Sequence, residues 1–254
     1  FVVLTFSWHY LITALGANAK YKDNSRVWIL SNAARYLPGT IWQYVGRIQL
    51  SSSYGIPVVI SSRGLVIESL LNLVAGLLVI VGSSLVLDLA VFQLKLYLLG
   101  ALLIGIVALF LLVNNPAAIN FFSRITKLEK LKLLTDMNKL SIINWTVLLV
   151  LLIIQFVLAG TILFLLVSMV FPLSVQFLPY VIVVYTLSWL LGYIAFLAPG
   201  GLGVQELSMA TLLSFYLPVG LAGGLAGGLA IAFRVISMLV ELIIFTFCSI
   251  VFKR

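Results

Sequence analysis

The sequence Arg35-Tyr36-Leu37-Pro38-Gly39 decides the fold, because its Pro-Gly dipeptide interrupts an apolar segment of membrane length. A second break, Pro199-Gly200, interrupts another apolar segment 161 positions later. Each break is followed after nineteen residues by a further proline, Pro57 in the first case and Pro218 in the second. Paired apolar segments interrupted by Gly and Pro in corresponding halves are typical of transporters. The sequence therefore predicts an internal repeat.

The composition indicates an all-α, polytopic membrane protein. Apolar residues make up 63% of the 254 residues and charged residues only 9%, against about a quarter charged in soluble domains. Several continuous apolar runs exceed the ~20 residues that a helix needs to cross a bilayer. The chain begins with Phe1 inside such a run, so we expect further N-terminal sequence to precede it.

Runs and breaks along the chain predict its helices. The first half contains a helix at roughly 1–17, a broken segment at 27–53, a helix at about 56–82 and a span at 91–113. The second half contains a span at about 141–171, a broken segment at 175–217 and a last helix that ends at Phe252. We interpret 1–254 as one transmembrane domain, with a first repeat at about 1–113, a connector at 114–140 and a second repeat at 141–254.

The distribution of basic residues predicts how the broken segments enter the membrane. Ten of the fifteen basic residues lie in the 18–27 loop, the 116–139 segment and the Lys253-Arg254 tail. All three regions face the cytoplasm, as the positive-inside rule requires, if the segment 27–53 turns back at Pro38-Gly39. The same rule makes 175–217 a hairpin entered from the outside, so the two re-entrant hairpins form an inverted repeat. The alternative is that Pro and Gly only kink ordinary spanning helices.

The basic segment 116–139 is predicted to lie on the cytoplasmic surface. Apolar residues recur there at three-residue spacing, with lysines and an arginine between them. Such a helix places its basic side chains towards anionic headgroups. The net charge of +8 therefore indicates a membrane surface as partner, and no nucleic-acid partner is expected.

Seven charged residues lie within or at the edge of apolar segments. A charge at the centre of the bilayer costs roughly 2.5–3.5 kcal/mol on the insertion scale, so each needs a partner or water. Four arginines against three glutamates leave one net positive charge, which suits an anionic group such as a phosphate. The alternative is that these charges pair among themselves and lock the helices together. They are Arg35, Arg47, Arg63, Glu68, Glu206, Arg234 and Glu241.

Sequence spacing suggests partners for some of these charges. Glu206 opens the helix after the second break, where exposed N–H groups attract either Glu206 itself or a bound anion. Arg234 and Glu241 lie seven residues apart on one helix face, as an internal ion pair or as parts of a polar path. Arg63 and Glu68 do not share a face, so no pair is expected between them. Arg47 has the further alternative of snorkelling to the interface.

The first break and its neighbours resemble a known signature. The string Arg35 to Gly39, with Trp42 and Gly46-Arg47 behind it, is similar to the first motif of the lysylphosphatidylglycerol synthase transmembrane region, a flippase-like membrane family. Glu68 and Arg234 fit the same pattern, as does the run Pro199-Gly200-Gly201-Leu202-Gly203-Val204-Gln205-Glu206. The resemblance covers most of the chain.

This resemblance implies a lipid translocase. Its expected substrate is an anionic phospholipid or a polyprenyl-phosphate-linked lipid, whose headgroup is held by intramembrane arginines at the broken helices. The expected location is a prokaryotic plasma membrane, with the basic loops cytoplasmic and membrane lipids as partners. The predicted substrate-binding residues are Arg35, Pro38, Gly39, Trp42, Arg47, Glu68, Pro199, Gly200, Gly201, Gly203, Glu206 and Arg234.

Two alternatives to a translocase remain at this point. One is a membrane component of a glycosyl- or aminoacyl-transfer system, with a protein partner that supplies the transferase activity. The sequence carries no cysteine–histidine pair, metal-ligand cluster or nucleotide-binding loop, so neither a catalytic residue nor a cofactor is predicted. No soluble transferase domain follows Arg254, so aminoacylation by this chain is not expected. The other alternative is a scaffold subunit of a larger membrane complex.

Overall fold

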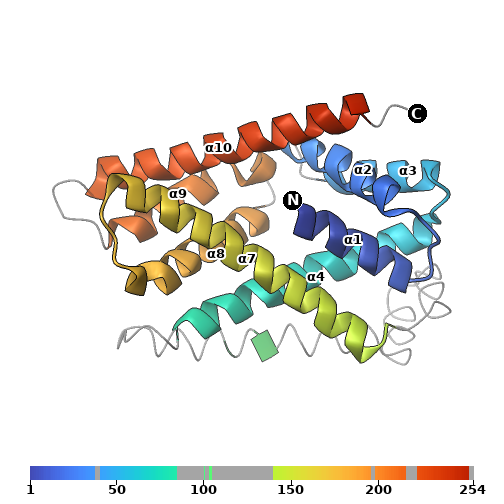
Figure 1. The fold of residues 1–254 in the computed structure, drawn as a ribbon, viewed down its shortest axis with the longest axis horizontal. Helices are drawn as coiled ribbons and strands as arrows, with labels where there is room; N and C mark the ends of the chain where they lie inside the picture. The colour runs from blue at the N-terminus through green and yellow to red at the C-terminus, as the bar shows by residue number, and fades with distance from the viewer. Residues whose placement is uncertain are drawn as a thin grey trace.

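The fold is a bundle of helices (Figure 1). The computed structural model describes residues 1–37, 41–84, 100, 103–104, 140–195, 198–215 and 222–251. The first half contains α1 (Val2–Ala14), α2 (Tyr21–Asn32), the 3₁₀ turn η1 (Ala33–Tyr36), α3 (Trp42–Ser53) and α4 (Val58–Ser84). The second half contains α7 (Ile142–Val170), η3 (Val175–Phe177), α8 (Leu178–Ile194), η4 (Pro199–Gly201), α9 (Val204–Ser214) and α10 (Ala222–Val251).

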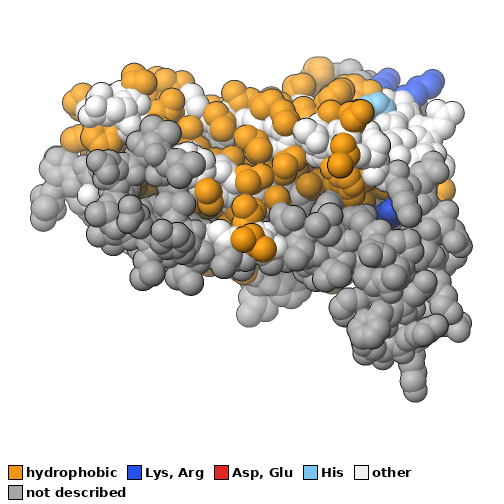
Figure 2. Space-filling model, turned by 90° about the horizontal axis from the view of Figure 1, so that it is seen from below, with side chains coloured by type: hydrophobic (Ala, Val, Ile, Leu, Met, Phe, Trp, Pro, Cys, Tyr) orange, Lys and Arg blue, Asp and Glu red, His pale blue; other side chains and the backbone are white. Residues whose placement is uncertain are grey.

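Four of the described helical segments are long and apolar enough to cross a membrane. They are Val58–Ser83, Ile142–Val170, Val175–Ile194 and Gly224–Ile250. Hydrophobic side chains dominate the described part of the face in Figure 2, and the Lys and Arg side chains on that face gather at one end. A surface of this kind requires lipid around it, because large exposed apolar areas are rare on soluble monomers. The chain is therefore an integral membrane protein, as the composition predicted.

Both predicted breaks are present as interruptions between helices. The first separates α2 from α3, and the second separates α8 from α9. Helix α2 begins earlier than expected, at Tyr21, so that Lys22, Asp23 and Arg26 belong to the helix and not to a loop. The carboxylate of Asp23 lies in the first turn, where it interacts favourably with the helix dipole. The span at 91–113, the surface segment 116–139, Pro38, Gly39 and the basic tail lie outside the described residues.

The same order of elements recurs in the two halves. In each half a helix is followed by a broken pair and then by a long helix. A shift of 161 positions carries α3 to 203–214, and α9 occupies Val204–Ser214. This agreement supports the predicted repeat, while its inverted orientation stays a prediction.

Helix lengths bear differently on the two proposed hairpins. With 12 residues each, α2 and α3 reach about 18 Å, which is less than the ~30 Å hydrocarbon core. The 20 residues of Val175–Ile194 are enough to cross that core. Length therefore favours a re-entrant course for the first broken segment only.

The core lies between α1, α4, α7 and α8, which pack on one another. Trp8, Phe156 and Leu163 are completely buried there. Helix α7 crosses α8 closely at Gly160, where an added Cβ would lie 2.7 Å from the Ile182 Cα. Small residues permit such close approach between membrane helices.

The glycines of α10 behave differently from Gly160. Gly223-Gly224 and Gly227-Gly228 lie four residues apart, a spacing that is typical of close packing between membrane helices. An added Cβ at Gly224, Gly227 or Gly228 meets no atom within 4 Å among the described residues. Close packing at these three glycines is therefore not found in the described part of the chain.

Substitution of Gly160 tests the α7–α8 contact. We expect Gly160→Ala to lower the stability of the detergent-solubilised protein by about 1–3 kcal/mol, because the Ile182 backbone has to move. The matched control is Gly82→Ala, whose new Cβ meets no described atom within 4 Å. Thermal unfolding followed by circular dichroism measures both variants. Equal stability of Gly160→Ala and Gly82→Ala would show that α7 and α8 do not approach closely at this position.

Candidate functional site

The two breaks lie against each other in the folded chain. The turn η1 contacts η4, and α10 packs against both η1 and α9. Gly200 has a positive φ of 57°, which favours glycine, and its Cα faces the ring of Tyr36. An added Cβ at Gly200 would lie 3.1 Å from Tyr36 Cδ1 and 3.4 Å from Arg234 Nη2. Segments about 160 residues apart in the sequence thus form one site.

At the first break, Arg35 forms an ion pair with Glu241 of α10. Tyr36 strengthens this pair: its hydroxyl donates to Glu241 Oε2 at 2.7 Å and accepts from Arg35 Nη2 at 2.8 Å. All three side chains are only partly buried, with 22% of the Arg35 side chain and 14% of the Glu241 side chain exposed. The pair therefore keeps a small part of its surface exposed.

At the second break, Arg234 of α10 holds three groups of the broken segment. Its Nη1 donates to Gln205 Oε1 at 2.6 Å, its Nη2 donates to the carbonyl of Gly200, and its Nε lies 3.1 Å from Glu206 Oε1. Glu206 Oε2 in turn accepts from the Gly203 N–H at 2.7 Å. Of the two alternatives for the start of α9, the structure shows the first, in which Glu206 itself satisfies the helix terminus.

Tyr36 connects these two groups of charges. The guanidinium carbon of Arg35 lies 4.9 Å from the centroid of the Tyr36 ring, and that of Arg234 lies 5.8 Å from it. A cation at such a distance is attracted by the ring quadrupole. We call Arg35, Tyr36, Gly200, Glu206, Arg234 and Glu241 the junction site.

A third ion pair, Arg47 with Glu68, lies elsewhere and is more deeply buried. Only 5% of the Arg47 side chain and 11% of the Glu68 side chain are exposed. Arg47 Nε donates to Ser31 Oγ at 3.0 Å, and Trp28 Nε1 donates to Glu68 Oε1 at 3.1 Å. The Arg47 guanidinium carbon lies 5.0 Å and 5.3 Å from the ring centroids of Trp8 and Trp28. This pair therefore connects α2, α3 and α4 and is enclosed by aromatic rings.

The remaining predicted site residues have simpler environments. Trp42, at the start of α3, is 49% exposed. Pro199 opens η4, and Gly203 precedes α9. Gly201 has a φ of 71°, and its Cα faces Gly192, so an added Cβ would lie 2.9 Å from the Gly192 Cα. Pro38 and Gly39 lie outside the described residues.

One of the two alternatives for Arg234 and Glu241 needs correction. They do not form an internal ion pair, because each pairs with a residue of a different broken segment. The count of four arginines against three glutamates still leaves one positive charge among the seven residues. At the two breaks, each guanidinium group has a carboxylate partner.

Three residues that contact the arginines of the two breaks were not predicted as site residues: Tyr36, Gln205 and Glu241. Tyr36 was part of the signature string, and its place beside Arg35 at the break was the available signal. Glu241 was counted among the charges but was not assigned to the site. Gln205 carried no separate signal apart from its neighbour Glu206. Among the described residues, no group of three His, Cys, Asp or Glu side chains is placed to hold a metal ion.

The buried pair gives a stability prediction. Glu68→Gln leaves Arg47 buried without a counter-charge, and we expect a loss of about 3–5 kcal/mol. The double variant Arg47→Met/Glu68→Leu removes both charges, and we expect it to recover most of that stability. Thermal unfolding in detergent measures both. If the double variant unfolds at the same temperature as Glu68→Gln, or at a lower one, the unpaired Arg47 charge is not the cause of the lost stability. That result would contradict a purely structural role of the pair.

Comparison with known proteins gives one family. The family described as the lysylphosphatidylglycerol synthase TM region matches residues 1–244. No curated protein and no solved structure matches the chain significantly. The matched residues include both broken segments and all three ion pairs. The chain therefore belongs to the lysylphosphatidylglycerol synthase transmembrane-region family.

Proposed function

We propose that this chain moves an anionic phospholipid, or a polyprenyl-phosphate-linked lipid, between membrane leaflets, and that the junction site receives the headgroup. The observation that carries the proposal is the meeting of both breaks at Tyr36, with Arg35 on one side and Arg234 on the other. Irregular backbone at membrane depth is tolerated where it is buried in protein or lines a water-filled cavity. The lysylphosphatidylglycerol synthase family supports a lipid-related role.

The chemistry at the junction site suits a phosphate that exchanges with carboxylates. Arginine presents a planar set of N–H donors that matches both carboxylate and phosphate oxygens. A phosphate that enters the site would compete with Glu241 for Arg35 and with Glu206 for Arg234. When the headgroup leaves, the carboxylates return to the guanidinium groups, so these are not left without a counter-charge. Such an exchange allows release as well as binding.

The arrangement of the elements suggests how the headgroup would pass. Each break belongs to a different half, and α10 holds both through Arg234 and Glu241. Tyr44 of α3 and Tyr193 of α8 add a hydroxyl–hydroxyl contact of 3.1 Å between the halves. A small rotation of one half against the other would open one side of the junction site and close the other, as in alternating access.

We assign a structural role to Arg47 and Glu68. Their side chains are more buried than Arg35, and two tryptophans enclose the guanidinium group of Arg47. A headgroup would have to displace these rings to reach it. The pair instead fixes α2 and α3 to α4, and thereby supports the first break.

A second candidate function is a scaffold subunit of a larger membrane complex. The observation that favours it is that six of the seven intramembrane charges form three internal pairs. Pairs of this kind fix helices to one another without any substrate. Translocation by the purified chain alone separates the two functions.

Substitution of the junction arginines tests translocation. The assay follows a headgroup-labelled lipid in proteoliposomes and measures how fast the label in the inner leaflet becomes accessible. We expect faster equilibration with the wild-type chain than in empty liposomes. We expect at least about a ten-fold loss with Arg35→Gln and with Arg234→Gln, because each removes charge-assisted hydrogen bonds to the phosphate.

The matched control is Arg63→Gln, which removes an intramembrane arginine from α4. This helix packs against α1, α3, α7 and α8. The Arg63→Gln variant should translocate lipid like the wild type. Wild-type rates in both arginine variants would refute the junction site while leaving translocation intact. No translocation by the wild type with anionic and polyprenyl-linked lipids would favour the scaffold function instead.

A further inference from the structure

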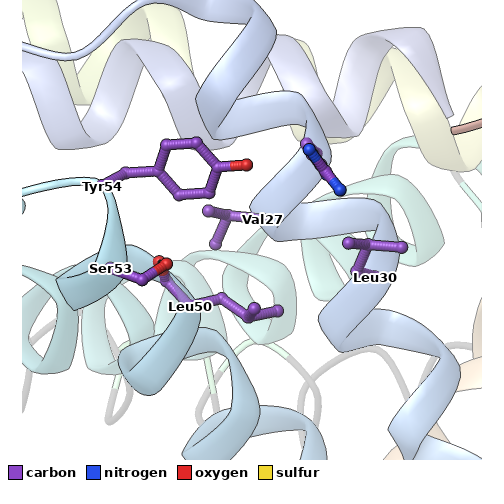
Figure 3. Close-up of a pocket in the computed structure, with 6 residues that line it drawn as sticks. Val27, Leu30, Leu50, Ser53 and Tyr54 are labelled. Carbon is purple, nitrogen blue, oxygen red and sulfur yellow. The ribbon is translucent and has the colours of Figure 1, made fainter. Parts of the chain in front are cut away.

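A pocket of about 200 Å³ lies between α2 and α3, as Figure 3 shows, but its polar side chains already have partners. Ser53 Oγ donates to the Leu50 carbonyl at 2.8 Å, and Arg26 and Tyr54 also interact with other residues. The rest of the lining is apolar. Polar groups without partners lie elsewhere, beside the junction site.

One face of α8 is turned towards the second break and carries two hydroxyl groups. An added Cβ at Gly192 would lie 3.1 Å from the Gln205 Cβ and 3.5 Å from the Gly201 Cα. Tyr185 and Ser188 precede Gly192 by seven and four residues, so all three lie on the same face of the helix. Both hydroxyl side chains are therefore placed beside η4 and α9.

Tyr185 reaches the charged groups of the junction site. Its ring lies edge-on to the ring of Phe233 on α10, with 5.6 Å between the centroids, and only 8% of the residue is exposed. It interacts electrostatically with Arg35, Arg234 and Glu241, so its side chain lies within range of the ion pairs at both breaks. The hydrogen bonds found among the described residues include none of the Tyr185 hydroxyl.

Ser188, which is completely buried, also has no hydrogen-bond partner among the described residues. Hydroxyl side chains in helices often donate to a backbone carbonyl one turn earlier, and neighbouring Thr186 does so to Ile182 at 2.7 Å. The Arg35 Nε–H at the first break is likewise buried without an acceptor in the described part of the chain. Buried polar groups without partners are costly, and a ligand that supplies the partner removes this cost.

We propose that the Tyr185 and Ser188 hydroxyls, together with Arg35, bind the phosphate of the lipid headgroup on the α8 side of the junction site. This inference rests on the proposed function and adds two residues of α8 to it. Phosphate oxygens accept hydrogen bonds, and the Tyr, Ser and Arg side chains each carry a donor, so one phosphate satisfies all three. The guanidinium group supplies the charge, and the hydroxyls fix the position of the phosphate between α8 and the breaks.

Removal of each hydroxyl tests the assignment through lipid binding and through protein stability. Native mass spectrometry of the detergent-solubilised protein measures its preference for phosphatidylglycerol over diacylglycerol with the same acyl chains. We expect Tyr185→Phe and Ser188→Ala each to lower this preference about ten-fold, because each removes a hydrogen bond to a charged group. Without added lipid, both variants should unfold at the wild-type temperature or above it, because the fold gives these hydroxyls no partner among the described residues.

The matched control is Thr186→Val, which removes a buried hydroxyl from the same helix, where it donates to the helix backbone. It should keep the wild-type preference. Three results would overturn the proposal: an unchanged preference in both Tyr185→Phe and Ser188→Ala, an equal loss in Thr186→Val, or lower unfolding temperatures of the two α8 variants without lipid. Displacement of phosphatidylglycerol by equimolar inorganic phosphate would overturn the assignment to a lipid.

Translocation in proteoliposomes separates this inference from the proposed function. If the wild type moves lipid and both α8 variants keep its preference for phosphatidylglycerol, the two hydroxyls are refuted and the proposed function stands. If the wild type moves no lipid but the variants lose the preference, translocation is refuted and the hydroxyl contacts with the phosphate stand.

Discussion

Charged side chains within a membrane need partners, and this constraint holds the two broken segments of the chain together. Two residues of α10, Arg234 and Glu241, each pair with a residue at a different break. They lie two turns apart on one helix face, so a single straight helix reaches both segments. If either carboxylate were missing, an arginine would lose its counter-charge in an apolar environment, and the contact between that break and α10 would be weakened.

The three ion pairs have different surroundings, which indicate different roles. The pair of Arg47 and Glu68 is enclosed by Trp8 and Trp28. Glu68 accepts a hydrogen bond from Trp28 and Arg47 donates one to Ser31, so the pair stabilises the first half. The two pairs at the breaks are more open and share the ring of Tyr36. A protein that exchanges a carboxylate for a phosphate needs this second kind of pair, because a fully enclosed one cannot change partners.

The sequence by itself determined the helical membrane class and the positions of the two breaks, and it predicted a repeat with an offset of 161 residues. These follow from local signals: apolar runs set the length of a helix, and Pro and Gly interrupt it wherever they occur. It also identified the charged residues, because a charge in an apolar run is conspicuous without knowledge of the fold.

Only the tertiary structure decided which charges meet. The spacing of Arg234 and Glu241 allowed an internal pair, but each has a nearer partner on another segment, and Coulomb attraction depends on distance in space. Tyr36 gains its place between Arg35 and Arg234 only because Gly200, from the other half, leaves room for its ring. Such contacts depend on the packing of helices from both halves, which no local pattern in the sequence contains.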